Sequence, residues 1–280
     1  MSVLRSVARQ VIPAHLRRVF WTAHYKGRSQ WTGKYRPELE WWFDRRHWLS
    51  ILRLRVLQGK HTGERCFIIG NGPSLSKMDL SPLRDEVTFG LNRIYLLFPK
   101  LGFSTTYYVS VNRLVIEQCA HEIEDLPMPK FINWHARDVI RFTPDMMFIR
   151  DPYEEPYDVL LDFSTNPASR IWEGSTVTYV AMQLAYYMGF RQVILIGVDH
   201  SFATKGEPHR TVVSSGPDPN HFDPTYFGKG FRWQLPDLEA SERAYRLAKR
   251  YFEQDGREIV DATLDGKLRV FRRMDYQALF

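Results

Sequence analysis

Short apolar runs recur along the chain after residue 64, and they constrain its fold more than any other feature. The best strand candidates are residues 66–69, 87–91, 106–111, 130–134, 146–150 and 193–197. Several are apolar almost without interruption, which is typical of strands covered on both faces. Helical periodicity marks residues 175–188 and 237–254. This order predicts an α/β fold, namely a Rossmann-like, doubly wound and mostly parallel sheet.

Both predicted helices end where the sequence offers a stop signal. Gly189 follows the first helix, and glycine at this position readily adopts the left-handed conformation that closes a helix. Asp255 and Gly256 follow the second helix.

A turn with mostly small side chains, Gly70-Asn71-Gly72-Pro73-Ser74, follows the first predicted strand. Glycines without a Cβ let backbone N–H groups come close to a ligand, and Asn71 offers both a donor and an acceptor. Ser74 offers a hydroxyl for a phosphate oxygen or for a helix cap. The turn suits nucleotide binding, although it matches neither GxGxxG nor a P-loop. A plain tight turn is the alternative.

Polar residues also follow the other predicted strands. Asn92 and Asn112 follow the second and third strands, and Asp199 and His200 follow the sixth. Gly174-Ser175-Thr176 opens the helix at 175–188, where free N–H groups favour an anion. Because ligands of open parallel sheets bind beyond the carboxyl ends of the strands, we expect these residues to line one crevice.

The first 60 residues are predicted to form a basic helical appendage, distinct from a catalytic domain at 61–280. Residues 1–37 contain no Asp or Glu, and their basic residues are Arg5, Arg9, Arg17, Arg18, Lys26, Arg28, Lys34 and Arg36. An amphipathic basic helix fits an anionic membrane surface, or it packs on the main domain or a second subunit of a homo-oligomer. No nucleic-acid motif accompanies the charge, so nucleic acid is not expected as a partner.

Composition narrows the class of protein further. The 280 residues are 44% hydrophobic and include only two cysteines, so neither a disulfide framework nor a zinc cluster is expected. The chain shows no apolar stretch of membrane-spanning length and no signal-peptide pattern. These features predict a cytoplasmic protein, peripheral to the membrane if the basic helix binds it.

Residues 200–236 are rich in Gly, Pro, His and Ser and show little periodicity. A loop of this length in a compact domain is usually a functional lid or a disordered segment. It contains or adjoins His200, His209 and His221, and histidine has the proton affinity that a general base needs near neutral pH.

Four segments resemble a known superfamily: "IIGNGPSL", "GLNRIY", "GSTVTYVAMQLAYYMGFRQVILIGVDHSF" and the tail from "HFDPTYFGKG" to "EIVDAT". That superfamily comprises Campylobacter-type bacterial sialyltransferases, the motility accessory factors that modify flagellin, and 6-hydroxymethylpterin pyrophosphokinase-like domains. The resemblance covers roughly residues 64–280. It implies a nucleotide site that includes Asn71, Gly72, Ser74, Asn92, Asn112, Gly174, Ser175 and Thr176. The positions of the turns add Gly70, Pro73 and Asp199 to the predicted nucleotide site.

The chain departs from the sialyltransferases at two places. They have phosphate-binding tyrosines shortly after the Gly-Ile-Asp that corresponds to 197–199. Here Lys205, His209 and Arg210 stand in that stretch, with Tyr226 further along, as the candidates that neutralise phosphate. The family's catalytic histidine corresponds to Lys229, so His221 and His200 are the alternative bases.

The resemblance therefore implies a glycosyltransferase that uses a nucleotide-activated sugar. The sialyltransferases in the superfamily point to a CMP-linked acidic sugar as the donor. Its acceptor would be a surface glycan, a glycolipid or a protein, and no cofactor or metal is required. One alternative is a pyrophosphokinase that uses ATP and Mg²⁺, for which Asp79 and Asp199 are available but no Asp-x-Asp pair. Another alternative is a non-catalytic nucleotide-binding module at a membrane.

Overall fold

The computed structural model describes residues 41, 43–151 and 161–280. Leu49–Phe280 form one compact unit and Met1–Trp48 another. The basic segment at 1–37 lies outside the described residues, so its predicted helix and its membrane contact stay predictions. Within the N-terminal unit, the Asp44 carboxylate forms an ion pair with the Arg46 guanidinium at 2.7 Å. Helix α4 (Arg45–Leu57) confirms helical structure near the end of the predicted appendage.

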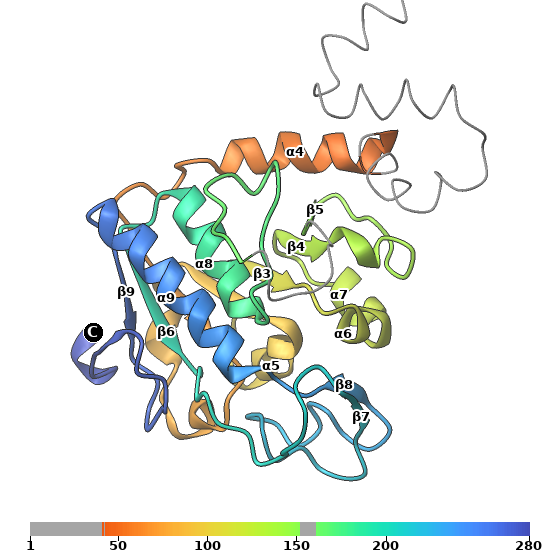
Figure 1. The fold of residues 1–280 in the computed structure, drawn as a ribbon, viewed down its shortest axis with the longest axis vertical. Coiled ribbons are helices and arrows are strands. Elements are labelled where there is room, and N and C mark those ends of the chain that lie inside the picture. Colours follow the sequence, from red (N-terminus) through yellow and green to blue (C-terminus); the bar gives the residue numbers. More distant parts are fainter. Residues whose placement is uncertain (1–40, 42, 152–160) are drawn as a thin grey trace, which may run out of the picture. The chain divides into compact units, whose positions relative to one another are not determined.

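The larger unit is built on one parallel sheet, as predicted (Figure 1). In the described part of the chain its strand order is β10-β9-β6-β1-β2-β3-β4-β5, and each neighbouring pair is parallel. The strands are β1 (Arg65–Ile69), β2 (Thr88–Leu91), β3 (Tyr107–Ser110), β4 (Lys130–Asn133), β5 (Met146–Ile149), β6 (Gln192–Ile196), β9 (Glu258–Asp261) and β10 (Arg272–Arg273). β9 and β10 extend the sheet beyond the strands that the apolar runs predicted.

Helices connect these strands. The two longest helices that lie between strands are α8 (Val177–Met188) and α9 (Leu238–Gln254), and they lie side by side (Figure 1). Both match the predicted helices, and Gly189 closes α8 in the left-handed conformation, as expected. The shorter helices are α5 (Phe98–Leu101), α6 (Arg113–Gln118) and α7 (Ala120–Glu124), and the 3-10 helices are η1 (Pro73–Lys77), η2 (Ser81–Asp85), η3 (Asn92–Leu97), η4 (Trp134–Ala136) and η5 (Gln277–Leu279). No helix among the described residues is long and apolar enough to cross a bilayer.

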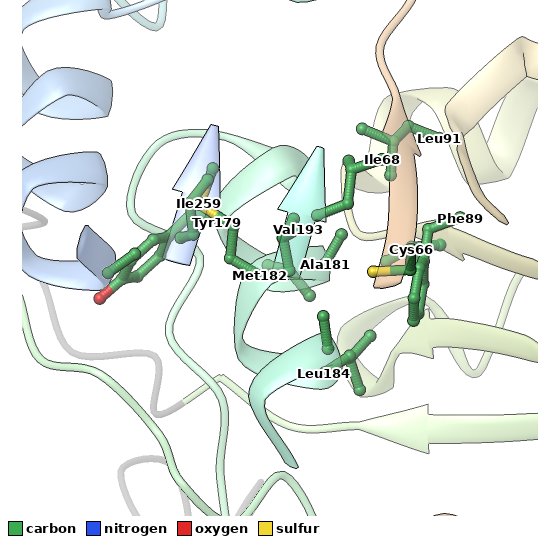
Figure 2. Close-up of a cluster of buried hydrophobic side chains, with 14 of the residues drawn as sticks. Cys66, Ile68, Phe89, Leu91, Tyr179, Ala181, Met182, Leu184, Val193 and Ile259 are labelled. Atoms are coloured by element: carbon green, nitrogen blue, oxygen red, sulfur yellow. The ribbon is translucent and has the colours of Figure 1, made fainter. Parts of the chain in front are cut away.

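The core lies between the sheet and helices α8 and α9. Figure 2 shows α8 side chains such as Met182 and Leu184 packed against strand residues such as Cys66 and Ile68. Alternate residues of β1, including Phe67, point to the other face of the sheet and are equally buried. Both faces are therefore covered, which explains why the strands are almost continuously apolar.

The segment at 200–236 is more ordered than the predicted loop. It contains a short antiparallel hairpin of β7 (Thr211–Val213) and β8 (Arg232–Gln234). An aromatic cluster of its own, which includes Tyr226, Phe227 and Trp233, packs around Val115 of α6. Strands of three residues are too short to produce a clear sequence period, and therefore the hairpin was not predicted.

The order of the strands sets where a ligand can bind. β1 pairs with β2 on one side and with β6 on the other, so the chain leaves β1 and β6 in opposite directions along the sheet. This is the topological switch point, where ligands of open α/β sheets bind. The turns that follow β1 and β6 meet there.

Candidate functional site

A cleft of about 360 Å³ lies at the carboxyl ends of the strands. Its volume falls within the range of small-ligand sites. The cleft is lined from the β1, β2 and β6 turns, the start of α8, and the 200–236 segment. It brings together these predicted site residues: Gly70, Asn71, Gly72, Asn92, Asn112, Gly174, Ser175, Thr176, Asp199, His200, His209, His221 and Tyr226.

Glycine is required at positions 70 and 72 because the turn after β1 lies close to the turn after β6. A Cβ on Gly70 would lie 2.2 Å from the carbonyl oxygen of Gly197, and one on Gly72 would lie 1.8 Å from Oδ2 of Asp199. The Gly70 N–H donates to the Ile196 carbonyl and the Gly72 N–H donates to the Gly197 carbonyl, at 2.8 and 2.9 Å. These two N–H groups are therefore bonded to the last residue of β6 and to the turn after it rather than free for a ligand, so the glycines shape the turn.

Ser74 and Asp199 bind each other across the same turn. The Ser74 backbone N–H and Oγ donate to the Asp199 carboxylate at 3.1 and 2.7 Å. Burial raises the pKa of Asp199, and the two bonds from Ser74 offset only part of that shift. Ser74 is buried and outside the cleft lining, so its hydroxyl holds Asp199 in place, and Asp199 is the group exposed to a ligand.

Four asparagines line the cleft, and the three that follow β1, β2 and β3 are each held by hydrogen bonds. Asn71 Nδ2 donates to the Leu91 carbonyl at 3.0 Å, and its Oδ1 is a buried acceptor without a partner in the described residues. Asn92 Oδ1 accepts from Ser110 at 3.0 Å. Asn112 caps α6 through its Oδ1, and its Nδ2 donates to Gln234 of β8 at 3.1 Å. Among these asparagines, Asn71 is therefore the one whose side-chain oxygen has no hydrogen-bond partner in the described residues.

The backbone at the cleft is locally strained. In the described part of the chain, the non-glycine residues at positive φ are Asn92, Ser175, His200, His209 and Asp265. All but Asp265 line the cleft. Such conformations cost about 1–3 kcal/mol each and cluster at functional sites. Ser175 lies between Gly174 and Thr176, the residue that caps α8 by accepting from the Thr178 N–H.

His221 lies in the cleft beside a buried carboxylate. Its Nδ1 is 2.7 Å from Oδ2 of Asp218, whose side chain is 2% exposed. Its ring stacks on Tyr226, with the ring centres 4.0 Å apart. No described residue forms a hydrogen bond with its Nε2. This ring is fixed in place and keeps one nitrogen available for proton transfer.

His200, the second predicted base, pairs with a different carboxylate. Its Nε2 is 3.1 Å from Oε1 of Glu242 on α9. Glu242 is partly exposed and also accepts from Arg246 at 2.5 Å. His200 therefore has Nδ1 as its remaining nitrogen.

Several predicted residues lie elsewhere. Lys205, Arg210 and Lys229 are exposed and do not line the cleft, and neither does Pro73. The other two predicted phosphate contacts, Tyr226 and His209, do line the cleft. The buried Tyr226 hydroxyl accepts from the Arg93 N–H at 3.3 Å, and Nε2 of His209 lies 3.7 Å from Oδ2 of Asp237.

Two carboxyl groups that the sequence did not single out also line the cleft, Asp151 and Glu173. The Glu173 backbone N–H donates to the Asp151 carboxylate, and Asn133 Nδ2 donates to Oε1 of Glu173. Burial, and then the charge of Asp151, raises the pKa of Glu173, while burial raises that of Asp151. They come from separate loops, so only a prediction of strand order could have brought them together.

Comparison with known proteins agrees with this fold. The model of a family described as 6-hydroxymethylpterin diphosphokinase MptE-like matches residues 47–205. The MAf glycosyltransferase from Magnetospirillum magneticum AMB-1 is similar in structure, with a TM-score of 0.51 and 16% identity over 84% of this chain and 39% of that one. The chain thus spans well under half of that protein, and the likeness shows a shared fold. No curated protein matches the chain.

Proposed function

We propose that the chain is a nucleotide-dependent transferase, because it belongs to the family described as 6-hydroxymethylpterin diphosphokinase MptE-like, whose model covers more than half of it. The reaction that we propose is glycosyl transfer from a nucleotide-activated sugar. Support comes from the fold shared with the MAf glycosyltransferase and from a cleft at the topological switch point.

One contact carries this proposal. The Phe222 N–H donates to the carbonyl of Asn71 at 3.0 Å, and this bond joins the loop of His221 directly to the turn after β1. A donor held at the turn and an acceptor hydroxyl near His221 would therefore lie in the same cleft. The donor site would comprise Asn71, Asp199 and the N-terminus of α8, whose dipole favours the phosphate.

The reaction needs one bond to form and one to break. The acceptor hydroxyl oxygen bonds to the anomeric carbon of the sugar, and the bond from that carbon to the donor's phosphate oxygen breaks. The leaving electron pair stays on the phosphate, where the helix N-terminus stabilises it. The hydroxyl proton moves to Nε2 of His221. We propose CMP as the nucleotide and an acidic sugar as the group transferred.

A screen of thermal stability tests the nucleotide class. Ligands that bind the folded state raise the melting temperature by mass action. We expect CMP to raise it without metal, more than CDP, UDP, GDP or ATP, and we expect Asn71→Ala to weaken the shift. Lys229→Ala is the matched control, because Lys229 lies outside the cleft. Failure of every nucleotide to shift the melting temperature would refute the proposal.

Asp151 and Glu173 favour a second candidate, diphosphoryl transfer from ATP. Mg²⁺ is usually held by one or two carboxylates together with substrate phosphates, and these two side chains would fit that role once the cation displaces the proton that burial favours on Glu173. No cluster of three or more metal-binding side chains occurs in the described residues. An Mg²⁺-dependent shift with ATP, lost in Glu173→Gln, would favour this reaction over glycosyl transfer.

We also propose that the basic segment at 1–37 brings the enzyme to a lipid-linked acceptor at the inner face of a membrane. The segment carries eight basic residues and no acidic one. Vesicles that contain anionic lipid should bind the full chain, and a truncated chain that lacks residues 1–40 should bind them less. Equal binding of the two chains would refute this role.

The remaining alternative is a nucleotide-binding module without catalytic activity. Such a module would bind CMP without turnover, and substitution of His221 would leave its function intact.

A further inference from the structure

Asp218 is a buried carboxylate with three hydrogen-bonding contacts, two of them to backbone N–H groups and one to His221. Its Oδ1 accepts from the Asn220 N–H at 2.8 Å, and its Oδ2 accepts from the Phe227 N–H at 3.0 Å. His221 Nδ1 contacts the same Oδ2 at 2.7 Å. Burial alone would raise the pKa of Asp218, but these bonds, first the one from His221, outweigh it and hold that pKa below its usual value.

Ionised Asp218 decides which nitrogen of His221 carries the proton. A carboxylate only accepts hydrogen bonds, so Nδ1 of His221 must be the donor in this pair. In the neutral ring the lone pair then lies on Nε2, the nitrogen with which no described residue forms a hydrogen bond. The stacked ring of Tyr226 and the edge contact with Phe227 prevent the imidazole from turning over.

The loop of this pair is anchored on both sides. Asn220 accepts from the Ala203 N–H at 2.7 Å and donates to Oγ1 of Thr204 at 3.1 Å. On the other side, Phe222 donates to Asn71 and accepts from Oγ of Ser76, each at 3.0 Å. The imidazole is therefore placed relative to the turn after β1 by short, local contacts.

We propose that Asp218 is the positioning residue that makes His221 a general base, an inference that rests on the transferase function proposed above. Asp218 holds Nδ1–H and leaves the Nε2 lone pair for the acceptor hydroxyl. When His221 takes that proton, its positive charge lies beside the carboxylate. The second pair is less suited, because the partner of His200 is 32% exposed and shared with Arg246.

The tautomer of His221 tests this assignment without any substrate. In protein labelled with ¹⁵N-histidine, long-range ¹H–¹⁵N spectra distinguish a proton on Nδ1 from one on Nε2, and the spectrum of His221→Gln identifies the signal. We expect Nδ1–H in the wild-type protein and a shift toward Nε2–H in Asp218→Asn, since an amide can donate to Nδ1. A wild-type ring with its proton on Nε2 would overturn the proposal.

Kinetics separate positioning from stability. We expect Asp218→Asn to lower kcat by roughly 10²–10⁴ with little change in the donor KM or in the CMP-induced thermal shift. Asp223→Asn is the matched control: Asp223 caps the turn at Thr225 in the same segment, does not line the cleft, and should leave kcat within a few-fold. An Asp218→Asn enzyme with unchanged kcat would refute the positioning role, whereas a wild-type protein with no turnover would refute the transferase function instead.

Discussion

The contact between Gly72 and Asp199 allows a quantitative test of the turn after β1. In Gly72→Ala the new Cβ would lie 1.8 Å from Oδ2 of Asp199 and 2.9 Å from the carbonyl oxygen of Gly197. The carboxylate must move, because the backbone of β6 holds the Gly197 side of the gap. The substitution should therefore break both bonds from Ser74 to Asp199.

The loss can be estimated from these contacts. Hydrogen bonds to a charged group contribute about 1.5–3 kcal/mol each, and overpacking costs about 1–3 kcal/mol. Part of this is offset, because burial already disfavours the ionised form of Asp199. We expect Gly72→Ala to lower the free energy of unfolding by about 2–4 kcal/mol, which for a domain of this size lowers the melting temperature by about 5–15 °C.

Urea unfolding followed by circular dichroism measures this change, provided that the slope against denaturant stays constant. A second substitution, Asp199→Ala, removes the group that collides with the new Cβ. The double variant should therefore be more stable than the two single losses predict, by about 1–2 kcal/mol. Gly216→Ala is the control, because a Cβ there has no neighbour within 4 Å. The reasoning is wrong if Gly72→Ala stays within about 0.5 kcal/mol of wild type, or if the losses simply add.

Three further predictions concern the carboxyl pair, the 200–236 segment and the core. Burial, then the charge of Asp151, raises the pKa of Glu173 from 4.5 to about 8, so the folded protein binds the extra proton between these pH values. Stability should therefore fall as pH rises through this window, and Glu173→Gln should flatten that fall in urea titrations, whereas Glu253→Gln on the surface should not. Arg93→Met removes donors to the carbonyls of Thr225 and Tyr226, and it should speed amide hydrogen exchange in residues 200–236 without changing exchange in α8. Leu184→Ala, at a fully buried position, should cost about 2–5 kcal/mol in urea unfolding, whereas Leu52→Ala, 58% exposed, should cost under about 1 kcal/mol.

Much of the sheet could be predicted because its strands are covered on both faces. Runs such as Cys66–Ile69 must then be apolar at every position, and this pattern is visible without neighbours. The polar residues after these runs could be placed together for the same reason, since parallel strands end at one edge. Asn71 and Asn92 therefore come from different turns and still line one cleft.

Features that depend on three-dimensional register could not be predicted in this way. Whether Lys229 or His221 faces the cleft depends on how a short hairpin and an aromatic cluster fold within 200–236. The proposed role of Asp218 depends on two backbone hydrogen-bond donors and on the stacked ring of Tyr226. The three-residue spacing between Asp218 and His221 reveals neither. Asp151 and Glu173 meet because the segment after β5 is bonded to the segment before α8, the Ile171 N–H donating to the Arg150 carbonyl at 2.8 Å. No sequence motif marks this contact.

The segment with the Asp218–His221 pair leaves the sheet after β6 and returns at α9, packed around aromatic side chains of its own. Its contacts with the rest of the molecule include the turn after β1, Arg93 of η3, Val115 of α6 and Glu242 of α9. Under the function proposed above, substitutions confined to this segment would change which alcohol is accepted. The proposed donor site at the turn after β1 and the start of α8 would keep its residues.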